Sequence, residues 1–116
     1  MHTKLVKFRG ASGRSYTFHA VSPELNLKNI GAVYAMTRRT QRNDGKEFHS
    51  VIFIGQTQDA LGTEIARLNN KLWELGHRCN CTCVYVERRE KYRLYIEEDL
   101  IQYYSPKVAS IGAKES

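Results

Sequence analysis

Three cysteines at alternate positions, Cys79, Cys81 and Cys83, raise the question of a metal site, since His77 precedes them and thiolates and imidazoles are zinc ligands. On a β-strand, residues i and i+2 lie about 6.6 Å apart. Sulfurs that share one tetrahedral zinc ion lie only about 3.8 Å apart. We therefore predict that the cysteines do not share an ion and are small hydrophobic residues on the core face of a strand, in a reducing compartment.

A second chemically suggestive group lies in a C-terminal helix predicted from about residue 88 to Tyr104. At about 100° per residue, Glu97 and Arg93 fall inside the apolar arc of this helix. A carboxylate there must be paired, bind a cation or be protonated, because burying an isolated charge is costly. An Arg93–Glu97 ion pair and a cation site at Glu97 are both open at this point. The predicted arc comprises Tyr92, Leu94, Ile96, Leu100, Ile101, Tyr103 and Tyr104, and the opposite side Glu98, Asp99 and Gln102.

Basic residues are concentrated in the first part of the chain. The sequence has 18 Lys and Arg against 12 Asp and Glu, a net charge of +6. Residues 1–50 hold nine basic and three acidic residues, and the remainder holds nine of each. Such an excess suits either phosphate contacts or solubility, and composition does not separate the two. The densest basic segment is a loop predicted at residues 37–50, with Arg38, Arg39, Arg42 and Lys46.

The elements that must position these residues form a predicted α+β domain. Residues 4–8 and 15–19 are rich in strand formers and predict a hairpin, and the short apolar runs 31–36 and 51–55 predict buried strands. Strand 81–86 and the C-terminal helix complete a small mixed, largely antiparallel sheet flanked by helices, with an N-terminal β-hairpin extension. An amphipathic helix between them has two acceptable N-caps, Asp59 and Thr63, and a stop at Gly76, and its stripe is Leu61, Ile65, Leu68, Leu72 and Leu75.

Length and hydropathy limit the class of protein. The 116 residues suit one domain, 1–116, and the 41% hydrophobic and 26% charged residues are those of an ordinary globular chain. No apolar run approaches the roughly 18 to 20 residues that span a bilayer, and no signal-type stretch follows the N-terminus. We expect a cytoplasmic protein with no membrane partner.

Four segments follow one another in a set order: the strand at 31–34, the strand at 53–57, the helix that follows, and residues 97–106, which read Glu-x-x-Leu-Ile before a proline. Together they resemble the GIY-YIG nuclease family. The match covers about residues 30–109 and leaves the hairpin at 1–20 and a polar tail at 110–116 outside it. The resemblance implies a domain with a GIY-YIG-like fold, and a family activity in which such a domain cleaves DNA with one divalent metal ion.

Carried over residue by residue, the resemblance makes Tyr34 the tyrosine that helps to activate the attacking water. It makes Glu97 the ligand of a single Mg²⁺ or Mn²⁺ ion, and Gly55 the glycine of the second motif. Arg67 on the first helix and Arg93 beside Glu97 are the candidates for the arginine that supports the phosphate, because a guanidinium can bind phosphate through two donors.

The sequence departs from the family pattern at several positions. The second-motif tyrosine is replaced by Phe53, which lacks the hydroxyl. Thr63 and Glu64 stand where the family has its helix arginine. Ala109 stands where the family commonly has an asparagine. Each lost donor or cation typically costs a factor of about 100 in phosphodiester cleavage.

These departures lead to three functional hypotheses. The first is a degenerate member of the family that binds nucleic acid, DNA rather than RNA, with impaired or lost nuclease activity. The second is an active, divalent-metal-dependent endonuclease that uses Tyr34, Glu97 and a relocated arginine. The third is a protein-binding, regulatory module that reuses the nuclease scaffold. The expected phosphate contacts are Arg38, Arg39, Arg42, Lys46, Arg88 and Arg89.

Overall fold

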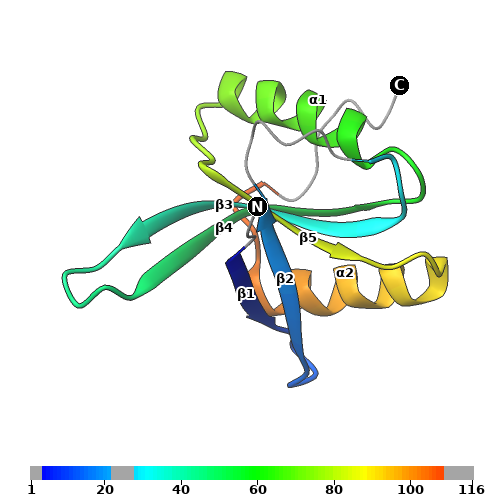
Figure 1. Cartoon of the computed structure of the whole chain (residues 1–116), viewed down its shortest axis with the longest axis horizontal. Helices are drawn as coiled ribbons and strands as arrows, with labels where there is room; N and C mark the ends of the chain where they lie inside the picture. Colours follow the sequence, from blue (N-terminus) through cyan, green and yellow to red (C-terminus); the bar gives the residue numbers. More distant parts are fainter. Residues whose placement is uncertain (1–3, 22–27, 109–116) are drawn as a thin grey trace.

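Five strands and two helices make up the part of the chain that the computed structural model describes, residues 4–21 and 28–108 (Figure 1). This is the predicted α+β class. Ala109 and the predicted polar tail lie outside the described residues. In chain order the elements are β1 (Lys4–Arg9), β2 (Ser15–Val21), β3 (Ala32–Gln41), β4 (Glu47–Thr57), α1 (Leu61–Glu74), β5 (Cys81–Val86) and α2 (Glu90–Tyr104).

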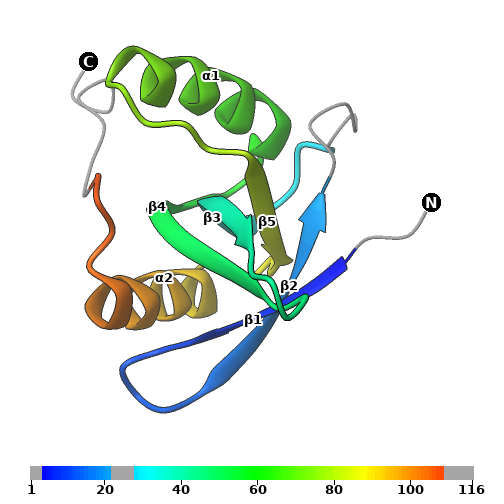
Figure 2. The same ribbon diagram turned by 90° about the vertical axis from the view of Figure 1, so that its left-hand side faces the viewer.

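The strands form one sheet in the order β1-β2-β5-β3-β4, and every neighbouring pair is antiparallel. Because β2 pairs with β5, the first hairpin extends the sheet, as predicted. The sheet curls, so that Lys4 on one edge strand forms an ion pair with Glu47 on the other. Helix α1 covers one face, and α2 lies on the opposite side together with the β1–β2 hairpin (Figure 2).

The apolar core lies on both faces of β3, an interior strand of the sheet. Successive residues of a strand point to opposite faces. Val33 accordingly belongs to a buried cluster that includes Leu100 of α2, and Tyr34 to a second cluster that includes Leu68 of α1. Burial on two faces explains why this part of the sequence is a continuous apolar run rather than an alternating one.

The basic segment at residues 37–50 is not the loop that the sequence predicted. β3 continues to Gln41 and β4 begins at Glu47, so a two-stranded arm, defined here as residues 38–48, projects from the body of the domain (Figure 1). Its turn contains Gly45 with φ of 84°, a left-handed conformation that favours glycine. Most of the arm is exposed on both faces, so it lacks the apolar alternation by which a strand is recognised in sequence.

Helix α1 carries the predicted apolar stripe except at its last position. Leu75 is exposed and Gly76 follows it with φ of 89°, the expected stop. The start of α1 is capped by a distant residue, since the Gly62 N–H donates to Asn29 Oδ1 at 3.0 Å. The buried stripe is Leu61, Ile65, Leu68 and Leu72.

The predicted apolar arc of α2 is wrong in part. Tyr92, Leu94 and Tyr103 are exposed, whereas Asp99, expected on the polar side, is only 7% exposed. The turn between β1 and β2 packs against the side of α2 that bears Asp99, and periodicity within the helix carries no information about that contact. The buried residues of α2 are Arg93, Ile96, Asp99 and Leu100.

The Asp99 carboxylate fixes the first hairpin to α2. Oδ1 accepts a hydrogen bond from the Ser12 N–H at 2.8 Å, and Oδ2 accepts from the hydroxyls of Ser12 at 2.7 Å and Tyr16 at 2.8 Å. A Cβ at Gly10 would lie 2.0 Å from Oδ2, so only glycine fits there. Burial raises the pKa of Asp99, but the hydrogen bonds from Ser12 and Tyr16 outweigh burial and lower it overall.

We predict that Asp99→Ala lowers the free energy of unfolding by roughly 2 to 4 kcal/mol, because it leaves three donors unsatisfied at the hairpin turn. The matched control is Glu98→Ala, the exposed neighbour on the same helix, which should change stability by less than about 0.5 kcal/mol. Urea denaturation monitored by circular dichroism measures both. Equal effects for the two variants would contradict a role for Asp99 in joining the hairpin to the helix.

Candidate functional site

Tyr34 lies in the interior against the α1 face of the sheet, with only 2% of its surface exposed. It is directly opposite Gly55 in the β3–β4 register. A Cβ at Gly55 would lie 2.6 Å from Tyr34 Oη and 3.0 Å from a ring carbon of Phe53. Glycine at position 55 therefore allows the Tyr34 ring to pass across β4.

Glu64 of α1 contacts the Tyr34 hydroxyl, and Arg67 of the same helix contacts Glu64. Tyr34 Oη donates to Glu64 Oε1 at 3.4 Å, and Arg67 Nη2 donates to the same oxygen at 3.1 Å. Glu64 and Arg67 are three residues apart, so they lie on one side of the helix. Arg67 Nη1 is buried and has no hydrogen-bond partner among the described residues. The structure thus brings Tyr34 and Arg67, two of the sequence-predicted site residues, to one place.

The electrostatics of this cluster keep Tyr34 protonated. Burial is the main cause that raises the pKa of Tyr34 well above its ordinary value of 10.0. The Glu64 carboxylate raises it further, the Arg67 guanidinium lowers it, and the Glu97 carboxylate also raises it. Glu97 of α2 therefore acts on the same hydroxyl. A neutral phenol can donate a hydrogen bond, but at neutral pH it is not a phenolate base.

Arg93 is enclosed in the protein, with 1% of its surface exposed. Its Nε donates to Gln56 Oε1 at 2.9 Å, and its Nη1 donates to the carbonyl oxygens of Glu87 at 3.1 Å and Arg88 at 2.8 Å. A Cβ at Gly31 would lie 2.7 Å from Nη1, so this glycine makes room for the guanidinium. A phosphate on the protein surface has almost no access to Arg93.

The positions at which the sequence departs from the family pattern lie around the same cluster. Phe53 is buried, and its ring centroid lies 6.2 Å from that of Tyr34. Thr63 is exposed in the first turn of α1, whereas Glu64 beside it points its carboxylate toward Tyr34. An acidic group therefore lies where a phosphate-supporting cation would be needed.

The residues predicted to contact phosphate do not form one patch. The arm, with Arg38, Arg39, Arg42 and Lys46, and the start of α2, with Arg88 and Arg89, lie at opposite ends of the long axis of the molecule (Figure 1). Some of these cations are also engaged within the protein. Arg39 Nη1 lies 3.7 Å from Glu47 Oε2, and Arg89 Nε donates to Glu87 Oε2 at 2.9 Å.

A divalent cation would find oxygen ligands beside Tyr34. The carboxylates of Glu64 and Glu97 both raise the pKa of the Tyr34 hydroxyl, which means that each contributes negative potential there. Carboxylate oxygens are the ligands that Mg²⁺ and Mn²⁺ prefer. The Arg67 guanidinium offsets part of this negative charge. A hard cation at this hydroxyl would have to draw its ligands from Glu97 and from Glu64, which already accepts a hydrogen bond from Arg67.

No family model, curated protein or solved structure matches the chain. None of the helices in the described residues is long and apolar enough to cross a membrane. Function is therefore proposed from the geometry of the described side chains and from the resemblance of residues 30–109.

Sequence reasoning gave no role in the site to two residues of this region, Glu64 and Gln56. Glu64 forms an ion pair with Arg67, three residues along a predicted helix. That spacing alone could have predicted the pair. Gln56, the partner of Arg93, is 37 positions away in the chain and had no local signal. Only the packing of α2 against the end of β4 brings that pair together.

We predict that Tyr34 makes the folded chain lose stability at alkaline pH. Its pKa is higher in the folded than in the unfolded chain, so its contribution is fully present below pH 10 and is lost as the pH rises above 10. Tyr34→Phe should make the fall in unfolding free energy above pH 10 less steep by up to about 1.4 kcal/mol per pH unit. Urea denaturation above and below pH 10 measures the slope.

The matched control is Tyr103→Phe, which removes the hydroxyl of an exposed tyrosine on α2. This variant should follow the wild-type curve. If Tyr34→Phe also follows it, the hydroxyl of Tyr34 is not held in a protonation-sensitive cluster.

Proposed function

We propose that this chain is a GIY-YIG-like nucleic-acid-binding domain that cleaves poorly, and that its arm makes the main contact. The observation that carries the proposal is the exposure of a basic, two-stranded arm, residues 38–48, on a small domain. Its four cations outnumber its two carboxylates, and one of these, Glu47, is already paired with Lys4. The arm is therefore electropositive toward a partner.

A two-stranded arm suits DNA better than RNA. The major groove of B-form DNA is about 12 Å wide and admits a β-ribbon, whereas that of A-form RNA is deep and narrow. Arg42 and Lys46 flank the turn at the tip and are exposed, so they can reach phosphates on either side of the groove. DNA bound in this way would be held mainly by its backbone.

We predict that Arg42→Gln reduces the slope of log Kd against log salt by about one for duplex DNA, because each phosphate contact releases about one counterion. Adding Lys46→Gln should reduce the slope by about two in total. Fluorescence anisotropy with a labelled duplex over a range of salt concentrations measures both changes.

The matched control for the arm is Arg14→Gln. Arg14 is also an exposed arginine at a hairpin turn, but it lies in the turn between β1 and β2. The control removes the same charge and should leave the salt slope unchanged. A slope near zero for the wild-type chain, or equal losses for Arg14 and Arg42, would contradict binding through the arm.

Impaired cleavage is supported by the contacts of the Tyr34 cluster. Phe53 supplies no hydroxyl, and the guanidinium of Arg67 is held by Glu64 instead of being free for a phosphate oxygen. Glu97 and Glu64 would hold Mg²⁺ or Mn²⁺, and such an ion, when bound, supplies a Lewis acid to a phosphate oxygen. Tyr34 would orient a water molecule by accepting a hydrogen bond from it, because the phenol proton is donated to Glu64.

One observation favours the second candidate function, an active endonuclease: a nitrogen of the Arg67 side chain has no partner within the described residues. Arg67 Nη1 is buried without a hydrogen-bond partner among the described residues, which leaves a donor for a phosphate oxygen. In that case Arg67 would be the relocated phosphate-supporting arginine.

We predict trace cleavage of plasmid or branched DNA by the wild-type chain with Mg²⁺ or Mn²⁺. Phe53→Tyr restores the missing hydroxyl beside Tyr34 and should raise the rate by roughly 100-fold. Adding Glu97→Gln should abolish the gain, because it removes the metal ligand. A gel assay of nicked and linear product measures the rates.

The outcomes of the cleavage assay separate the two candidate functions. Strong wild-type cleavage that Glu97→Gln abolishes supports the active endonuclease and contradicts impaired cleavage. Cleavage that persists in Glu97→Gln comes from another site or a contaminant. If Phe53→Tyr folds but remains at the wild-type rate, position 53 is not what limits the chemistry.

A further inference from the structure

A second group of chemically reactive side chains lies on the other face of the sheet from Tyr34. Cys81 of β5 is directly opposite Thr37 of β3, and Cys83 is opposite Ala35, so the two thiols project beside the same strand. His49 of β4 reaches the group from the other side of β3, where its ring bonds Thr37. Three adjacent strands thus place two thiols and an imidazole together in the interior.

The distances in this cluster correct the spacing argument made from the sequence. Cys81 Sγ and Cys83 Sγ lie 3.8 Å apart, much closer than their positions along the strand suggested. The side chains lean toward each other, whereas the predicted distance described the backbone. One ligand atom from each of His49, Cys81 and Cys83 lies within 4.8 Å of the others. A sulfur separation of about 3.8 Å is what two bonds of about 2.3 Å to one tetrahedral zinc ion require.

Burial alone accounts for only part of this arrangement. Cys81 and Cys83 are buried in the core, as predicted for small hydrophobic residues. His49, however, is an ionisable side chain only 10% exposed, and its Nε2 is buried without a hydrogen-bond partner among the described residues. A buried polar atom without a partner is costly and needs an explanation. A bound metal ion next to the two thiols would supply that explanation.

The imidazole is held as metal-binding histidines usually are. His49 Nδ1 lies 2.8 Å from Thr37 Oγ1, and His49 Nε2 lies 4.0 Å from Glu47 Oε1. With Nε2 as the nitrogen that binds the metal, the Thr37 hydroxyl at Nδ1 orients the ring. Thr37 is wholly buried, so its hydroxyl is a fixed partner.

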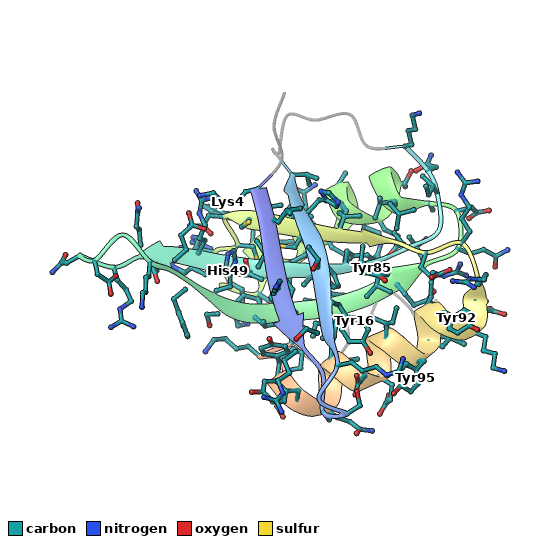
Figure 3. The ribbon with its side chains drawn as sticks, turned by 60° about the horizontal axis from the view of Figure 1, so that its bottom comes forward. Lys4, Tyr16, His49, Tyr85, Tyr92 and Tyr95 are labelled. Carbon is teal, nitrogen blue, oxygen red and sulfur yellow. The ribbon has the colours of Figure 1, made fainter. Side chains whose placement is uncertain are left out.

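A groove exposes the His49 member of this cluster to solvent. A hollow of about 370 Å³ between β1 and β4 is lined in part by Phe8, Glu47, His49 and Tyr104. His49 lies beside β1 in Figure 3, below Lys4. The thiols do not line the hollow, so an ion from this side would reach them past His49, and the Glu47 carboxylate is a candidate for the fourth ligand.

We propose that His49, Cys81 and Cys83 form a binding site for one zinc ion, with Glu47 or water as the fourth ligand. Two thiolates and an imidazole are a soft ligand set that selects zinc over Mg²⁺. The two thiols lose their protons to solvent when the ion binds. The site is separate from the carboxylates beside Tyr34, and it does not depend on nucleic-acid binding.

The test uses cobalt as a spectroscopic substitute for zinc. The full chain is reduced, freed of metal and titrated with Co²⁺. We expect one equivalent to produce thiolate-to-cobalt charge-transfer absorption and the visible bands of tetrahedral cobalt, both removed by one equivalent of Zn²⁺. Zn²⁺ should also raise the thermal unfolding temperature, because it binds the folded chain.

Variants assign the signal to the site. Cys81→Ser and Cys83→Ser should remove the charge-transfer band, and Cys79→Ser, the matched control outside the cluster, should retain it. Thr37→Val should weaken Zn²⁺ binding by about 10- to 100-fold, because it removes the partner that orients His49. His49→Gln replaces a residue at the wall of the groove and tests the site if a buried cysteine variant fails to fold.

Three results would overturn the proposal. The first is a folded wild-type chain that shows no thiolate-to-cobalt band, which would leave Cys81 and Cys83 as core residues only. The second is a band that Cys79→Ser abolishes as completely as Cys83→Ser does, and the third is a band that a folded His49→Gln variant keeps with unchanged affinity. Either of these two would show that the metal is bound by a different set of ligands.

Discussion

A buried positive charge that has to be hydrogen-bonded on every side organises one end of this molecule. Arg93 is the largest side chain among those fully enclosed in the described structure. Removing a guanidinium from water is tolerated only where protein acceptors replace the lost hydration. Gln56 near the end of β4 and the carbonyls of residues 87 and 88 after β5 supply them, and Gly31 before β3 leaves the space. The ends of three strands and the first turn of α2 are therefore held in one arrangement, and Tyr34 lies three residues beyond Gly31 within it.

The sheet separates two kinds of chemistry, and β3 contributes to both. Tyr34 faces α1, where its hydroxyl bonds the Glu64 carboxylate and Glu64 in turn bonds the Arg67 guanidinium, groups of the kind that bind hard cations and phosphate oxygens. Thr37 faces the opposite side, where it meets an imidazole beside two thiols, a set suited to soft metals. The arm continues from the same strand into solvent. The single strand β3 thus positions the Tyr34 cluster, the thiol cluster and the basic arm. The distances between them are set by the rise per residue of that strand.

Sequence patterns predicted the elements well wherever a segment meets only one environment. The stripe of α1 and the two hairpin strands at the N-terminus follow directly from period and composition. The predictions failed where a strand has no apolar face or where a segment distant in the chain covers a helix. The arm was taken for a loop because most of it is exposed on both faces. Asp99 was predicted on the exposed polar side of α2. It is buried because Ser12 and Tyr16, more than 80 positions away in the chain, contact it, and the helix period carries no information about that contact. The predicted distance between the cysteine sulfurs was wrong for a local reason. It was taken from the backbone rise, whereas side-chain rotation also changes the distance between the sulfurs.

The sequence by itself determined which segments outside the arm are helices and strands, that Tyr34 and Gly55 lie on buried strands, and that Glu97 and Arg93 share one part of a helix. These properties depend on local propensity and on the period of apolar residues. Tertiary structure alone decided that Arg67 and Glu64 meet Tyr34, that Gln56 receives Arg93, and that His49 joins Cys81 and Cys83. Each of these contacts depends on strand register and helix packing. A shift of one residue would turn each strand side chain to the other face, and nothing within a short stretch of sequence specifies that register.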